Sequence, residues 1–115
     1  MRVIDFHNHY YPPRYMQALQ SGQSTVRVEV NAEGDPVIHY PGDFNVAVRG
    51  HRDLAYRQGV LDEHGVAMQV LTLTTPGTHV ETPAVAARLA SLVTMSSARR
   101  SRGEGITSRR WRRCR

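Results

Sequence analysis

The order of apolar and polar positions along the chain predicts two buried strands with a hairpin between them. Residues 3–6 form a short apolar run, and residues 66–73 are apolar almost throughout, as in parallel strands buried on both faces. Residues 25–30 alternate between apolar and polar side chains, and a return strand follows the turn-forming residues 31–36. The pattern therefore predicts a mixed α/β chain with a β-hairpin at 25–40.

Three helices are expected outside these strands. The segment 12–20 opens with two prolines, which suit the first turn of a helix because no N–H is needed there. Asp53 can cap a second helix that ends near residue 64, and Thr82 can cap a third. The apolar residues of the third helix recur at the spacing of a stripe that faces a core. They are Val85, Leu89, Leu92 and Val93.

Charge is concentrated in the last part of the chain. Residues 1–93 carry seven Arg against nine Asp and Glu, whereas residues 94–115 carry eight Arg against one Glu. The second segment also lacks Leu and Val, and Arg and Ser make up 12 of its 22 residues. The composition changes within the third expected helix, with no Gly or Pro at the boundary. We therefore expect residues 94–115 to be a frameshifted, disordered tail.

The chemically distinctive stretch is Asp-x-His-x-His at the end of the first strand. Side chains of a strand alternate, so His7 and His9 point to the same side, with Cα atoms roughly 6.6 Å apart. Two imidazoles at this spacing can each place a nitrogen about 2.0–2.1 Å from one Zn²⁺ ion. Asp5 lies on the same side and could accept a ring N–H, as carboxylates behind metal ligands do. The spacing predicts a metal-binding pair supported by Asp5.

This apolar strand, with its two histidines and the two prolines that follow, resembles the opening of the amidohydrolase superfamily. It is more similar to the decarboxylase-like branch, which includes aminocarboxymuconate-semialdehyde decarboxylase and the resorcylate-type decarboxylases. The resemblance covers residues 1–93, with the run 61–70 as a helix-to-strand junction and the hairpin at 25–40 as a small insertion. It implies an α/β fold, the N-terminal portion of a (β/α)₈ TIM barrel. The portion is truncated, because a whole barrel needs at least about 200 residues.

The resemblance also implies a metal-dependent enzyme with one divalent metal, preferably Zn²⁺, held by His7 and His9. Such enzymes decarboxylate or hydrolyse small carboxylic acids that are aromatic or unsaturated, and the metal activates water or polarises the substrate. The remaining ligands and the catalytic acid–base of the family have no counterpart in this sequence. We therefore expect an N-terminal fragment that is inactive as this chain, from a parent enzyme that can be homodimeric.

Three polar residues are candidates for contact with a substrate. Asn45 stands where the aminocarboxymuconate enzymes carry an arginine for the substrate carboxylate, and this departure argues against the same substrate. Arg49 follows one helical turn later and could replace that arginine. His79 lies in the loop after the second parallel strand, on the face where a barrel has its active site. The remaining histidines are not expected to take part in function: His39 is expected to be solvated in the hairpin, and His51 and His64 flank the second helix.

Two other classes of function remain open. The run 109–113, with four arginines and one tryptophan, could bind nucleic acid through phosphates and stacking. This reading is disfavoured because the basic charge is confined to the tail. Alternatively, the chain is a small non-catalytic α/β module that has kept its histidines incidentally.

The sequence shows no sign of membrane insertion or secretion. No apolar run approaches the roughly 20 residues of a membrane span, and no secretory signal is visible. Cys114 is the only cysteine and cannot form an internal disulfide. A cytoplasmic protein is therefore expected.

Overall fold

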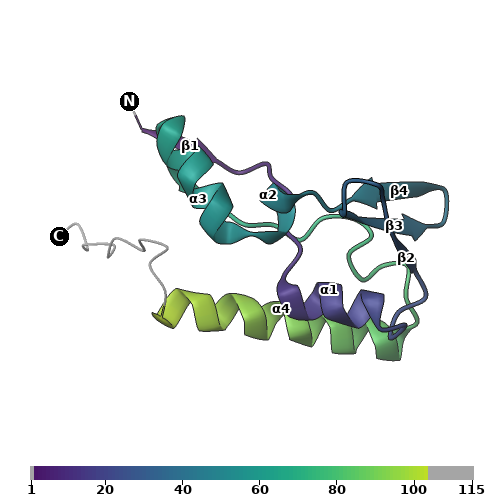
Figure 1. Ribbon diagram of the computed structural model, residues 1–115. Coiled ribbons are helices and arrows are strands. Elements are labelled where there is room, and N and C mark those ends of the chain that lie inside the picture. Colours follow the sequence, from purple (N-terminus) through teal and green to yellow (C-terminus); the bar gives the residue numbers. More distant parts are fainter. Residues whose placement is uncertain (1, 104–115) are drawn as a thin grey trace.

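The computed structural model describes residues 2–103 of the chain, and its architecture is mixed α/β (Figure 1). In chain order the elements are β1 (Val3–Asp5), α1 (Pro13–Gln20), β2 (Arg27–Val30), β3 (Pro36–Tyr40), β4 (Asp43–Val46), α2 (Arg49–Arg52), α3 (Leu54–Glu63), β5 (Val66–Gln69) and α4 (Pro83–Gly103). Within these residues the strands form two separate sheets, one of β1 and β5 and one of β2, β3 and β4.

Strands β1 and β5 are parallel neighbours, as the two apolar runs predicted. Their register pairs Val3 with Val66 and Asp5 with Gln69, with an irregularity after Val3. The Val70 N–H then donates to the Asp5 carbonyl at 2.9 Å. The carboxyl ends of the two strands therefore lie at the same edge of the molecule.

The second apolar run differs from the prediction in both length and burial. Strand β5 ends at Gln69, and an isolated bridge between Tyr10 and Leu73 continues the parallel pairing. The ladder is short because β1 itself has only three residues. Met68 is 47% exposed, since two strands cannot cover both of their own faces. The prediction that residues 66–73 are buried on both faces is therefore wrong.

The predicted hairpin is confirmed, and a third strand extends it. Strands β2 and β3 are antiparallel, with Arg27 opposite His39 and Val30 opposite Pro36. A turn through Gly42, whose φ is +85°, leads into β4, which pairs with β3. Glycine suits this turn because a side chain would be strained at positive φ. The sequence analysis did not predict β4, although Asp43–Val46 alternates polar and apolar residues, because the strand directly follows turn-forming residues that close the hairpin.

The hydrophobic core lies between α1, α4 and the three-stranded sheet. Its most buried side chains include Tyr15 and Leu19 of α1, Ile38 of β3 and Leu89 of α4. Helices α1 and α4 lie side by side (Figure 1), so the apolar stripe predicted for the third helix does face a core. The best-buried part of the molecule is thus built by elements other than β1 and β5.

Helix α4 extends beyond the point where the composition changes. It passes through Thr94 and continues to Gly103. The hydroxyls of Thr94 and Ser96 donate to carbonyls four residues earlier, at 3.0 and 2.7 Å, and such bonds are compatible with a continuing helix. Adding a residue to an existing helix costs far less than nucleating one. A change of composition therefore does not have to end the helix.

The tail predicted at 94–115 is described only in part. The backbone of residues 94–103 is helical, which differs from the expected disorder. Residues 104–115 lie outside the described part of the chain. The predictions placed there, a nucleic-acid-binding run at 109–113 and the single cysteine Cys114, lie outside it as well. None of the described helices is long and apolar enough to cross a membrane.

Candidate functional site

The two histidines of the sequence motif lie on the loop that follows β1. Their ring centroids are 5.9 Å apart, and the ring planes are inclined by 52°. Two imidazoles that share one zinc ion, each with a nitrogen about 2.0–2.1 Å away, have ring centres roughly 5–6 Å apart. His7 is exposed and His9 is half-buried. The spacing of the two rings therefore suits a shared divalent cation.

Asp5 supports this loop through its backbone. One carboxylate oxygen accepts the His7 backbone N–H at 2.9 Å, and the other accepts the Gln69 side-chain amide at 2.5 Å. The Gln69 hydrogen bond is the main cause that lowers the pKa of Asp5, and the His7 N–H acts in the same direction. Among the described residues, the expected hydrogen bond from an imidazole N–H to Asp5 is not made. The ionised carboxylate instead holds the main chain of the loop that carries His7 and His9.

Asn8, between the two histidines, fastens the loop to the segment after β5. Its Nδ2 donates to the Val70 carbonyl at 2.6 Å, and the Thr72 hydroxyl donates to the Asn8 carbonyl at 2.5 Å. These bonds join residues that are 62 and 64 positions apart in the sequence. The loops that follow the two parallel strands are therefore held together.

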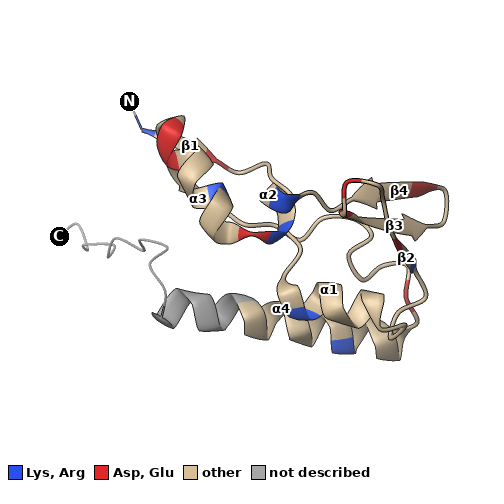
Figure 2. Cartoon of the chain, viewed as in Figure 1, with Lys and Arg blue, Asp and Glu red and all other residues tan. Residues whose placement is uncertain are grey.

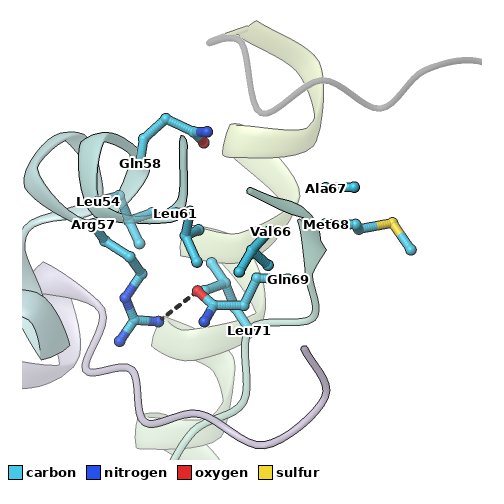
Figure 3. A pocket seen from close by; sticks show the side chains of 9 residues that line it. All are labelled: Leu54, Arg57, Gln58, Leu61, Val66, Ala67, Met68, Gln69 and Leu71. Carbon is cyan, nitrogen blue, oxygen red and sulfur yellow. Dashed lines mark hydrogen bonds between the residues drawn. The ribbon is translucent and has the colours of Figure 1, made fainter. Parts of the chain in front are cut away.

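Arg57 of α3 contacts the same loop from within the protein. Its Nε donates to the Gly50 carbonyl at 2.7 Å, and its Nη1 donates to Asn8 Oδ1 at 3.3 Å and to Gln69 Oε1 at 3.1 Å. Its Nη2 donates to the His9 carbonyl. Figure 3 shows the side chain extending from α3 toward Gln69 of β5. Burial lowers the pKa of Arg57, but a guanidinium keeps its charge in proteins.

The structure brings a third histidine, His51 of α2, close to the pair. Its ring centroid is 5.5 Å from that of His9 and 6.3 Å from that of Tyr11. Its Nδ1 is buried and makes no hydrogen bond of standard geometry among the described residues. Burial lowers the pKa of His51, and the nearby Val46 main chain opposes this effect. No local pattern predicts this contact, because His9 and His51 meet only in the fold.

Asn45, a candidate for substrate binding, uses its amide within the protein. Its Nδ2 donates to the Thr75 carbonyl at 2.9 Å and to the Thr75 hydroxyl at 2.6 Å. The Tyr11 hydroxyl also donates to the Thr75 carbonyl, at 2.7 Å. Burial raises the pKa of Tyr11, so this hydroxyl keeps the proton that it donates. Asn45 and Tyr11 together anchor the loop after β5.

The other two substrate candidates lie on the surface. Arg49 belongs to the basic helix α2 (Figure 2), and its Nε donates to the Asp53 carboxylate at 3.1 Å. Its guanidinium also lies over the ring of Tyr56, 4.6 Å from the centroid. His79 is exposed in the loop after β5. In the part of the chain that the structure describes, no hydrogen bond or ring contact joins these substrate candidates to the histidine pair.

A small pocket lies between α3 and β5, beside the contacts of Arg57 (Figure 3). Its volume is about 70 Å³, well below the roughly 300–1,000 Å³ of sites for small molecules. Arg57, Gln58 and Gln69 contribute polar groups to its lining. The apolar lining comes from Leu54, Leu61, Val66, Ala67, Met68 and Leu71. No histidine lines this pocket, so it is separate from the candidate metal pair.

The set of metal ligands is incomplete within residues 2–103. His7 and His9 provide two nitrogens, but no group of three or more His, Cys, Asp or Glu side chains in this range is arranged to hold a metal ion. A catalytic zinc site normally has three protein ligands and one open position. Among the described residues, His7 and His9 are therefore one protein ligand short of such a site.

No protein-family model matches the chain, and no curated protein matches its sequence. A function is therefore inferred from the residues and from their geometry.

Proposed function

We propose that the chain derives from the N-terminal portion of a (β/α)₈ barrel enzyme of the amidohydrolase superfamily, in its decarboxylase-like branch. The parent enzyme would use a divalent metal, Zn²⁺, to decarboxylate or hydrolyse a small aromatic or unsaturated carboxylic acid. The observation that carries the proposal is the position of His7 and His9, whose rings lie 5.9 Å apart directly after the parallel strand β1. With two ligands, this chain would bind metal without turnover.

The arrangement of β1 and β5 supports a barrel origin. The two strands are parallel neighbours, and α3 precedes β5 in the chain. Barrel enzymes build their active sites from the loops at the carboxyl ends of the strands. Here Asn8, after β1, donates to Val70, after β5, at 2.6 Å. The candidate metal pair and the next loop thus have the proximity that two successive barrel strands require.

The exposed apolar side chains in and directly after the parallel strands also favour this origin. Val3, Ile4, Met68 and Val70 are 39–47% exposed. In a barrel such residues are covered, because side chains fill the interior and helices surround the outside. The sequence of these strands thus suits a larger sheet than β1 and β5 form.

A bound divalent ion would supply a Lewis acid and an activated water. His7 and His9 would contribute neutral imidazole nitrogens as ligands. Asp5 and Asn8 would hold the ligand loop in place, through the His7 N–H and the Val70 carbonyl. These residues position ligands, and the proton transfers of the parent reaction would need further groups.

Zinc titration of the purified chain tests the proposal. We expect weak binding near neutral pH that becomes weaker in acid, because protons compete with the metal for the imidazole nitrogens. Replacing His7 and His9 together by Ala should abolish this binding.

The matched control removes two other imidazoles, through His39→Ala and His64→Ala together. This variant should bind zinc as the wild type does. Loss of binding in both double variants to the same extent, or no binding by the wild-type chain, would contradict the proposal.

A further inference from the structure

We infer that Arg57 is a positioning residue, which sets the geometry of the metal-binding pair His7 and His9. The inference rests on the proposed function, because it concerns the same pair. Arg57 itself lies on α3, and its guanidinium donates to the main chain of His9, to the side chain of Asn8 and to β5. Through these hydrogen bonds the Arg57 side chain links α3, the loop that carries the two histidines, and β5.

The shape of the guanidinium explains why an arginine suits this position. Nη1 donates to Asn8 Oδ1 at 3.3 Å, and Nη2 donates to the His9 carbonyl, so two nitrogens of one guanidinium form hydrogen bonds with adjacent residues of one loop. The planar fork fixes the direction of both bonds, which a lysine ammonium on its flexible stem cannot do. Holding the His9 carbonyl restricts the peptide plane after His9. Arg57 thereby limits the directions in which the His9 imidazole can point.

The same side chain also fixes the neighbour of His9 on α2. Arg57 Nε donates to the Gly50 carbonyl at 2.7 Å, directly before His51. The Tyr11 N–H donates to the His51 carbonyl at 2.9 Å and ties α2 to the chain beyond the loop. The 5.5 Å spacing of the His9 and His51 rings therefore depends on the placement of Arg57. His51 in turn limits the space into which the His9 ring can rotate.

The charge of Arg57 and its hydrogen bonds should have opposite effects on zinc affinity. A cation close to a metal site repels the metal, so loss of the Arg57 charge alone should strengthen zinc binding. Loss of the hydrogen bonds should weaken zinc binding, because the ligand loop gains freedom that the metal must then remove. The sign of the change in zinc affinity therefore identifies which role Arg57 has.

The experiment compares zinc affinity among the wild-type chain, Arg57→Gln, Arg57→Lys and Arg49→Gln. We expect Arg57→Gln to weaken binding by about tenfold or more, within the 10–100-fold range typical of residues that orient metal ligands. Arg57→Lys keeps the positive charge but lacks the planar guanidinium, so this variant should also bind zinc more weakly. Arg49→Gln removes an exposed arginine that does not contact the histidine loop, and should leave the affinity unchanged.

A chemical rescue separates positioning from a general loss of structure. Zinc binding by Arg57→Ala should recover several-fold when guanidinium is added at millimolar concentration, since the cation can occupy the vacated position. Circular dichroism and urea unfolding establish that each compared variant is folded. If the Arg57 variants do not fold, Asn8→Ala provides the test: it removes the Arg57 contact together with the Asn8 bond to Val70, so an unchanged zinc affinity would overturn the positioning role. It should then weaken zinc binding several-fold.

The outcomes distinguish this inference from the proposed function. If zinc binding does not depend on His7 and His9, the proposed function fails. If zinc binding depends on His7 and His9 but is unchanged or stronger in a folded Arg57→Gln variant, the positioning role alone is overturned. Where the Arg57 variants do not fold, unchanged zinc binding by Asn8→Ala has the same meaning.

Discussion

The carboxylate of Asp53 illustrates how single residues act on the backbone in this chain. Its Oδ1 accepts the Tyr56 N–H at 3.0 Å at the start of α3, which confirms the predicted helix cap. This hydrogen bond is the main cause that lowers the pKa of Asp53, and the Arg49 side chain acts in the same direction. The ionised form therefore stabilises the first turn of the helix that carries Arg57.

The lowered pKa predicts an acid-sensitive contribution to stability. It is fully present above the unfolded-state value of 3.8 and is lost as the pH falls through the lower folded-state value. Asp53→Asn can still cap the helix but has no charge to lose. Below pH 4 the urea midpoint of this variant should therefore vary less with pH than that of the wild type. Equal pH dependence in the two proteins would show that Asp53 does not contribute in this way.

At the same scale, the sequence predicted that His7 and His9 lie close together, but it did not predict their surroundings. Strand β1 ends at Asp5, so His7 and His9 lie on a loop, where their separation of two residues leaves the ring centroids 5.9 Å apart. The contacts of Arg57 and His51 join residues of different elements. They depend on how α2 and α3 pack against the loop, and no local spacing encodes that packing.

At the scale of elements, the hairpin and the starts of α1, α3 and α4 were predictable, because turn residues, caps and prolines act locally. The short helix α2, strand β4 and the end of α4 were not. Strand β4 gains its structure from pairing with β3, where Val37 lies opposite Val46. Helix α4 continues past Thr94 because its earlier turns already pack on α1. In both cases the secondary structure depends on packing against a neighbouring element, which is β3 for β4 and α1 for α4.

The position of the core predicts unequal sensitivity to truncation of apolar side chains. Leu89 of α4 is fully buried, so Leu89→Ala should cost about 2–5 kcal/mol of unfolding free energy. Met68 of β5 is 47% exposed, and Met68→Ala should change stability by less than about 1 kcal/mol. Urea unfolding followed by circular dichroism measures both. A Met68→Ala loss as large as that of Leu89→Ala would mean that the parallel pair is covered in solution.

At the scale of the whole molecule, the best-buried side chains and the candidate site belong to different elements. The core is formed by α1, α4 and the sheet of β2, β3 and β4, whereas His7 and His9 follow the exposed pair of β1 and β5. This division agrees with a site that needs a larger sheet to be complete. The frameshift interpretation of residues 94–115 stays a prediction, and an open frame one nucleotide away that encodes further strand–helix units would support it.

We propose that His7 and His9 bind one divalent metal ion together. X-ray absorption at the zinc edge of the zinc-loaded chain measures this most directly, because imidazole rings give a characteristic outer-shell signal. We predict two imidazole nitrogens at about 2.0–2.1 Å, with oxygen from water in the remaining positions. The imidazole signal should disappear when His7 and His9 are both replaced by Ala. An unchanged imidazole signal in that variant, or a wild-type spectrum without imidazole, would contradict the claim.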